Sequence, residues 1–123
     1  MDKVLAKDFV VDWLDAWNAH DIDRVLSHYT ENFEMSSPLI AQLLGERSGV
    51  LRGKHAVGDY WRKALQLVPN LRFELISVLL GVNSITIYYK GAKGQISAEV
   101  FEFDPSGLVT KASAHYAMTD CAT

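Results

Sequence analysis

Four stretches rich in β-branched and aromatic residues occupy the second half of this 123-residue chain, and only short turns separate them. They read LRFELISVLLG, SITIYYKG, GQISAEVFEF and LVTKASAHYAM, and they lie between residues 71 and 118. The turn Asp104–Gly107 has proline in its second position and glycine in its fourth, as a type I turn prefers. Because such short linkers usually join neighbouring antiparallel strands, the pattern predicts an antiparallel meander.

The first half of the chain predicts three helices. Apolar residues recur at four-residue spacing over residues 3–18, Asp21 can cap a second helix over residues 22–29, and a third helix covers 54–68. Asp12 lies on the other face of the first helix, which we expect to be solvated. Helices followed by a meander indicate an α+β fold, with the helices covering one face of a curved, mostly antiparallel sheet.

Two segments between the helices are less regular. The stretch NFEMSSP, residues 32–38, predicts a short strand that Pro38 ends, with Phe33, Met35 and Ser37 on one face. Residues 39–49 form either a helical turn or a flap. No repeat or boundary interrupts the chain, so residues 1–123 are expected to form a single domain.

Composition excludes several classes of function. Nearly half of the residues are hydrophobic and the net charge is −3, with no cluster of lysine or arginine to bind nucleic acid or an acidic membrane surface. No apolar run approaches the length of a membrane span. The lone Cys121 cannot form an internal disulfide, so we expect a cytoplasmic protein. The spacing of the four histidines fits no metal site, and no cofactor is expected.

Two glutamates lie three residues apart in the strand SAEVFEF. Because residues alternate faces along a strand, Glu99 shares a face with Phe101 and Phe103, and Glu102 lies on the opposite face with Val100. Whichever face is the interior, a carboxyl group lies there beside apolar neighbours. Parity alone leaves both glutamates as candidates for the interior.

The order of these elements resembles the NTF2-like superfamily, specifically its SnoaL-like branch. The resemblance rests on WLDAWNAHDIDRVLSHYTENFEMSSP, GVLRGKHAVGDYW and EVFEFDPSGLV, and it covers nearly the whole chain. It implies a cone-shaped fold with a pocket between the helices and the concave sheet face, and often a homodimer through the convex face. The family includes ketosteroid isomerase, polyketide cyclases, dehydratases and hydrolases, so the fold does not settle the function.

Residue by residue, the resemblance argues against ketosteroid isomerase activity. In that isomerase an aspartate before the proline moves the proton, and the position that looks equivalent here is Ser37. A tyrosine that donates to the oxyanion is replaced by Trp13, whose indole N–H cannot exchange protons. The isomerase's second donor is a carboxylic acid kept neutral by an apolar site, and its position looks like Glu99.

The family pattern thus selects Glu99 as the inward carboxyl and the candidate catalytic group. In the alternative, Glu99 is a structural residue whose carboxyl group forms its hydrogen bond with Trp13, Ser37 or a tyrosine. Inward parity and the family pattern together select the candidate ligand-binding residues Trp13, Trp17, Met35, Ser37, Trp61, Ile87, Tyr89, Phe101 and Tyr116.

Two classes of function follow from this reading. In the first, the chain catalyses proton transfer on a small hydrophobic or aromatic carbonyl compound, as an isomerase, cyclase or dehydratase would. In the second, it is a non-catalytic ligand-binding or dimeric interaction module, and Glu99 only orients the ligand. A second titratable group within hydrogen-bond reach of Glu99 would favour the first.

Overall fold

The computed structural model describes residues 1–118, so Cys121 lies outside the described part of the chain. The helices are α1 (Lys3–Asn18), α2 (Ile22–Leu26), α3 (Pro38–Leu44) and α4 (Lys54–Leu67), and a 3-10 turn, η1, covers Ala92–Gly94. The strands are β1 (Tyr29–Ser36), β2 (Val50–Arg52), β3 (Glu74–Leu80), β4 (Ser84–Lys90), β5 (Ile96–Phe103) and β6 (Val109–Tyr116).

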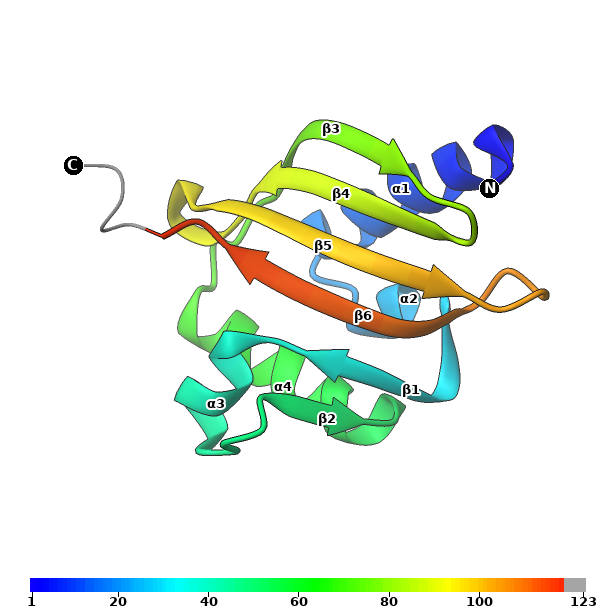
Figure 1. Ribbon diagram of the computed structural model, residues 1–123. Coiled ribbons are helices and arrows are strands. Elements are labelled where there is room, and N and C mark those ends of the chain that lie inside the picture. Colours follow the sequence, from blue (N-terminus) through cyan, green and yellow to red (C-terminus); the bar gives the residue numbers. More distant parts are fainter. Residues whose placement is uncertain (119–123) are drawn as a thin grey trace.

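The strands within residues 1–118 form one sheet in the order β2-β1-β6-β5-β4-β3. Strands β3 to β6 are the expected antiparallel meander, and β1 joins β6 in parallel. Figure 1 shows the curved sheet with α1, α2 and α4 on the same face. The predicted α+β class, with helices covering one face of a curved and mostly antiparallel sheet, is therefore confirmed.

The segment around Pro38 differs from the prediction in its details. Strand β1 already begins at Tyr29 and ends at Ser36. Ser37 leaves the strand and caps α3, because its Oγ accepts a hydrogen bond from the backbone N–H of Leu39 at 3.2 Å, and Pro38 begins the helix. The undecided segment 39–49 thus starts as a helix, which ends at Gly45 in the left-handed conformation.

Asp12 corrects the expectation of a solvated helix face. Its carboxylate accepts hydrogen bonds from the guanidinium of Arg24, and its second oxygen lies 2.6 Å from Nε2 of His28. The hydrogen bond from Arg24 lowers the pKa of Asp12. The aspartate therefore joins α1 to α2 and to the segment that leads into β1, contacts that depend on how the helices pack.

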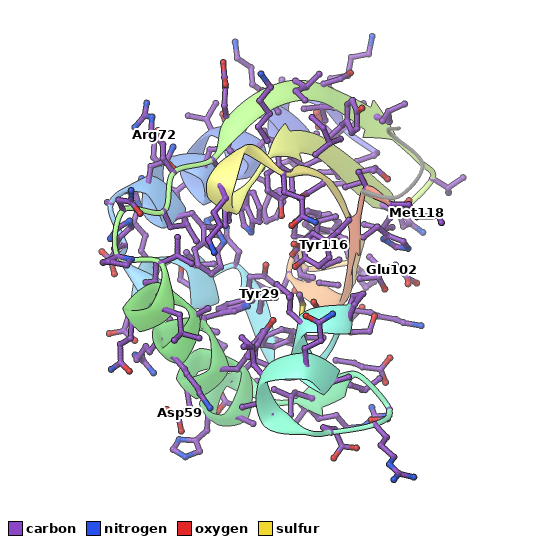
Figure 2. All side chains as sticks on the ribbon, turned by 90° about the vertical axis from the view of Figure 1, so that its left-hand side faces the viewer. Tyr29, Asp59, Arg72, Glu102, Tyr116 and Met118 are labelled. Carbon is purple, nitrogen blue, oxygen red and sulfur yellow. The ribbon has the colours of Figure 1, made fainter. Side chains whose placement is uncertain are left out.

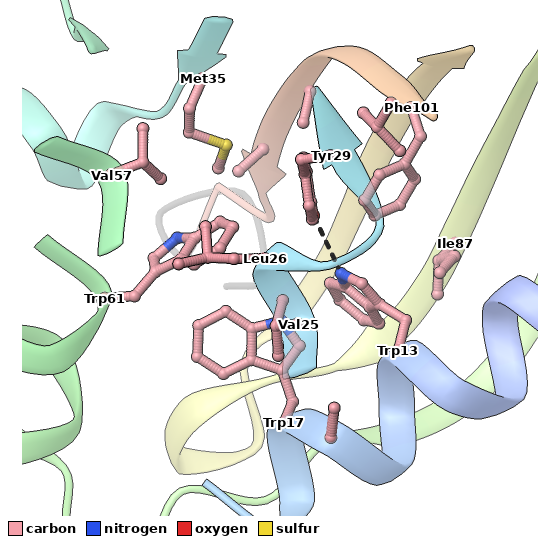
Figure 3. Packing of buried hydrophobic residues seen from close by; sticks show 14 of the residues in the cluster. Trp13, Trp17, Val25, Leu26, Tyr29, Met35, Val57, Trp61, Ile87 and Phe101 are labelled. Atoms are coloured by element: carbon pink, nitrogen blue, oxygen red, sulfur yellow. Dashed lines mark hydrogen bonds between the residues drawn. The ribbon is translucent and has the colours of Figure 1, made fainter. Parts of the chain in front are cut away.

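The core is centred on the indole ring of Trp13. Its ring packs against Trp17, Phe73, Tyr89 and Phe101 at centroid separations between 5.3 and 6.3 Å. Its N–H donates a hydrogen bond to the hydroxyl of Tyr29 at 3.1 Å, drawn as a dashed line in Figure 3. Trp13 therefore links α1 to the sheet through both packing and a buried polar contact.

The two faces of β5 differ as the family pattern predicts. Glu99 and Phe101 are buried on the helix-covered face, whereas Glu102 is exposed on the other. Large apolar side chains on the edge strand β3 and the ring of Tyr88 on β4 are also exposed. The homodimer through the outer face stays a prediction. Among residues 1–118, every helix is too short or too polar to cross a bilayer.

Candidate functional site

A cavity of about 690 Å³ opens between the sheet and the pair of helices α3 and α4. Figure 2 looks at this side of the molecule, and Tyr116 projects there from β6 toward the hollow. Most of the wall is apolar, formed by Trp17, Met35, Leu39, Leu43, Trp61, Ala64, Leu67, Val68, Leu71, Phe73 and Ala92. The polar part of the wall is formed by Tyr60, Tyr89, Lys93, Gln95, Ser97, Glu99 and Tyr116.

Glu99 is the buried carboxyl group of this cavity, with only 5% of its surface exposed. Strand β5 lies between β4 and β6, so Glu99 pairs with Ile87 on one side and Ala114 on the other, and its side chain faces the helices. The hydroxyl of Tyr89 donates to its Oε1 at 3.5 Å, which is a long contact. The carboxyl therefore has little compensation for its lost hydration.

Burial raises the pKa of Glu99 from 4.5 to about 8, and the hydrogen bond from Tyr89 opposes this only in part. At neutral pH the side chain is thus mostly protonated. A neutral carboxylic acid carries an O–H that can donate to an acceptor on a ligand. The environment therefore makes Glu99 a hydrogen-bond donor and a potential general acid.

Four tyrosines surround this carboxyl group closely enough to interact with it electrostatically: Tyr29, Tyr60, Tyr89 and Tyr116. Burial raises the pKa of each phenol, and the charge of ionised Glu99 raises it further. These phenols therefore stay protonated near neutral pH, so they can donate hydrogen bonds but cannot serve as bases.

Ser37 lies behind the wall rather than on it. Its Oγ, already the acceptor for the cap of α3, lies 3.3 Å from the hydroxyl of Tyr116, and either hydroxyl can donate. Ser37 also interacts with the hydroxyl of Tyr60, which lowers the pKa of that phenol and offsets part of the effect of its burial. A serine with these partners orients two tyrosines and has no basicity to contribute at neutral pH.

The structure brings six of the ten predicted site residues to the cavity: Trp17, Met35, Trp61, Tyr89, Glu99 and Tyr116. Trp13, Ile87 and Phe101 are corrected to core positions, each 1% exposed or less and none on the cavity wall. The reason is that α1 covers the part of the concave face that holds Ile87 and Phe101. Phe9 and Trp13, both of α1, pack on Phe101 at 5.1 and 5.3 Å. Inward parity alone does not distinguish the part of the sheet under a helix from the part left open.

Several residues that line the cavity were not among the ligand-binding residues predicted from the sequence. Tyr60 lies one turn before Ala64, so the helical stripe of α4 contained a signal for it. Ser97 precedes Glu99 by two residues and shares its face, which strand parity could have shown. Leu39 and Leu43 belong to α3, the segment whose conformation the sequence left open.

The described part of the chain offers no evident site for a metal ion. Among residues 1–118, no three side chains of histidine, cysteine, aspartate or glutamate lie close enough together to hold one. Two histidines, His28 and His55, each meet one aspartate, Asp12 and Asp59 respectively, and these are pairs rather than ligand sets.

Comparison with known families and structures places this geometry among related proteins. A family model described as SnoaL-like domain matches residues 10–116. A SnoaL-like protein of unknown function from Burkholderia thailandensis is 56% identical, with 95% of this chain and 98% of that chain covered and a TM-score of 0.92. No curated protein matches the chain.

More distant structures share the fold alone. The epoxide hydrolase/cyclase-like enzyme SalBIII, described for pyran ring formation in the polyether salinomycin, is 19% identical over 97% of this chain and 95% of that one, with a TM-score of 0.76. A computationally designed 17-OHP binder is 14% identical over 93% and 92% of the two chains, with a TM-score of 0.72.

Proposed function

This chain belongs to the SnoaL-like domain family, and on that premise we propose that it binds a small, largely apolar carbonyl compound on which Glu99 acts as a neutral acid. The observation that carries the proposal is a carboxyl group, 5% exposed and with a pKa of about 8, on the wall of an otherwise mostly apolar cavity. Structural ion-pair networks can also perturb a pKa, but within residues 1–118 the hydrogen bond to the Glu99 carboxyl is a long one from a neutral phenol.

The size and chemistry of the cavity support a small organic ligand. Ligand sites commonly enclose roughly 300–1,000 Å³ and are lined by apolar and aromatic groups with a few polar ones. The cavity of about 690 Å³ falls within that range, and the rings of Trp17, Trp61 and Phe73 offer flat apolar surfaces. A designed 17-OHP binder with the same fold is in keeping with a hydrophobic ligand of this kind.

The proposed reaction is proton transfer, of the isomerase, cyclase or dehydratase type. The O–H of Glu99 donates a hydrogen bond to the carbonyl oxygen of the ligand and stabilises the negative charge that develops there. When the proton is transferred, the O–H bond of Glu99 breaks, the ligand oxygen gains the proton, and the carboxylate left behind can take up a proton from the ligand or from water. Tyr116 and Tyr60 would orient the ligand as neutral donors.

One observation favours the alternative of a non-catalytic binding module. Within residues 1–118, the hydrogen-bond partner of the Glu99 carboxyl is Tyr89, whose pKa lies well above 10 because it is buried. Ser37, at the position that by resemblance looks equivalent to the base of ketosteroid isomerase, is the cap of α3. Glu99→Gln separates the two functions: an enzyme would lose turnover by orders of magnitude, and a binder would lose only modest affinity.

The pH dependence of ketone binding tests the proposal. We expect the wild-type protein to bind the aromatic ketone Prodan about tenfold more weakly at about pH 9.5 than at about pH 6.5, because ionised Glu99 no longer donates to the carbonyl oxygen. Glu99→Gln keeps a donor that does not ionise, so its affinity should change less than twofold. Fluorescence titration of Prodan at the two pH values measures both affinities.

Two substitutions to tryptophan on α4 test whether the ketone occupies the cavity. Ala64 lines the cavity, whereas Gln66 is exposed and does not. Ala64→Trp should therefore abolish binding, and Gln66→Trp should leave it unchanged. Equal binding by Ala64→Trp and the wild type, or the same pH dependence in the wild type and Glu99→Gln, would contradict the proposed function.

A further inference from the structure

Polar side chains line one wall of the cavity from its mouth to its buried end. Lys93 of η1, Gln95, and then Ser97 and Glu99 of β5 follow one another at two-residue intervals, and all four line the cavity. In β5 this spacing puts the side chains on one face. Since a strand rises about 3.3 Å per residue, Ser97 and Glu99 are about 7 Å apart along β5, and Gln95 precedes that strand.

The facing wall has the opposite character. It is formed by α3 and α4, which contribute the apolar side chains Leu39, Leu43, Ala64, Leu67 and Val68. Lys93 and Leu67 are exposed, whereas Glu99 is buried, so the first two mark the mouth and the last marks the deep end. A molecule that fills this space would have one oxygen-bearing edge and one apolar edge.

The side chain of Lys93 carries the positive charge on the polar wall of the cavity. Among the lining residues that belong to the described part of the chain, the other ionisable carboxyl or amine is Glu99, which is buried at the deep end, so no acidic side chain of this described lining neutralises Lys93 at the mouth. Its backbone is also unusual, with φ at 59° and ψ at 25°. Glycine and asparagine suit this left-handed conformation better than lysine, and residues held there often cluster at ligand sites.

From this arrangement we infer that the cavity takes an elongated organic anion: an aromatic or alicyclic body whose acceptor oxygen meets Glu99 and whose anionic group meets Lys93 at the mouth. The inference rests on the proposed function, because it assumes that a ligand fills the cavity. It adds a charge to that ligand and places the charge at the end opposite the reacting oxygen. Lys93 would then act as a specificity-determining residue, since a neutral ligand of the same shape lacks the ion pair.

Two fluorescent probes of nearly the same skeleton test the charge requirement. Anilinonaphthalene sulfonate is an anion, and N-phenylnaphthylamine lacks the sulfonate. We expect Lys93→Glu to weaken sulfonate binding about tenfold, because an attractive pair at a partly exposed site becomes a repulsive one. Lys93→Asn suits the left-handed backbone and should weaken it about threefold. Neither variant should change the affinity for the neutral probe by more than twofold.

Lys90→Glu is the matched control, because Lys90 is exposed on the neighbouring strand, is not on the cavity wall, and carries the same change of charge. It should leave both affinities unchanged, and added salt should weaken only sulfonate binding. If both probes bind and are displaced by Ala64→Trp, but Lys93→Glu acts like Lys90→Glu, the charge inference is overturned and the proposed function stands. If Ala64→Trp displaces neither probe, the proposed function fails as well.

Discussion

Replacing Glu99 with glutamine is expected to make the protein more stable at high pH, by about 3 to 5 kcal/mol at about pH 9, and to change its stability by about 1 kcal/mol or less near pH 5. The pKa of Glu99 is about 8 in the folded chain and takes its ordinary value of 4.5 when the chain unfolds. Between these two values the folded state holds a proton that the unfolded state has released. The stability of the wild type therefore falls as the pH rises through this window, whereas glutamine has no proton to lose.

Urea unfolding of both proteins at the two pH values measures this difference. The informative quantity is the change with pH in the gap between wild type and variant, because any constant effect of the amide on packing cancels. Glu102→Gln serves as the control, since Glu102 lies on the same strand but is exposed on the opposite face. Parallel stability curves for the wild type and Glu99→Gln would show that burial does not perturb this carboxyl.

Trp13→Ala is expected to cost about 3 to 5 kcal/mol of folding free energy. The substitution removes the ring that packs on Trp17, Phe73, Tyr89 and Phe101, and it leaves a cavity that the surrounding rings cannot fill. Because small domains are stable by only about 5 to 15 kcal/mol, the variant should unfold at much lower urea concentration than the wild type. The shift in the urea midpoint, with unchanged slope, measures the loss.

A smaller replacement separates packing from hydrogen bonding at Trp13. Trp13→Phe keeps much of the ring but removes the donor to the Tyr29 hydroxyl, and Tyr29→Phe removes the acceptor. A double-mutant cycle on this pair should give a coupling of about 1 kcal/mol. A cost below about 2 kcal/mol for Trp13→Ala would instead place the ring at the edge of the core, on the cavity side.

The sequence predicted the strands and the opposite faces of Glu99 and Glu102 because strand parity is a local property, and the family resemblance selected Glu99 as the inward carboxyl. Whether an inward residue packs in the core or lines the cavity depends on how α1 and α4 divide the concave face. Trp13 of α1 and Phe101, which packs against it, are core residues, whereas Trp17, one turn beyond Trp13 on the same helix, reaches the cavity. No spacing rule within a helix or strand contains that information.

Side-chain interactions between different helices and strands could also not be predicted from the sequence. Asp12 occupies a polar face of α1, and its partners Arg24 and His28 come from the next helix and the loop after it. Tyr60 and Tyr116 meet at Ser37 although they belong to α4 and β6. These contacts depend on where each helix lies over the sheet. A hydrophobic pattern predicts which face of a helix is buried, but not which residues of other elements that helix will contact.

Whether Glu99 is a neutral acid at physiological pH can be measured directly. Carbon NMR of protein labelled at the glutamate side chains follows the carboxyl signal through a pH titration, and the signal absent from Glu99→Gln identifies the residue. The structure predicts that this signal titrates with a midpoint of about 8. A midpoint near the ordinary value of 4.5 would mean that Glu99 is ionised at neutral pH, and it would contradict the proposed role as a proton donor.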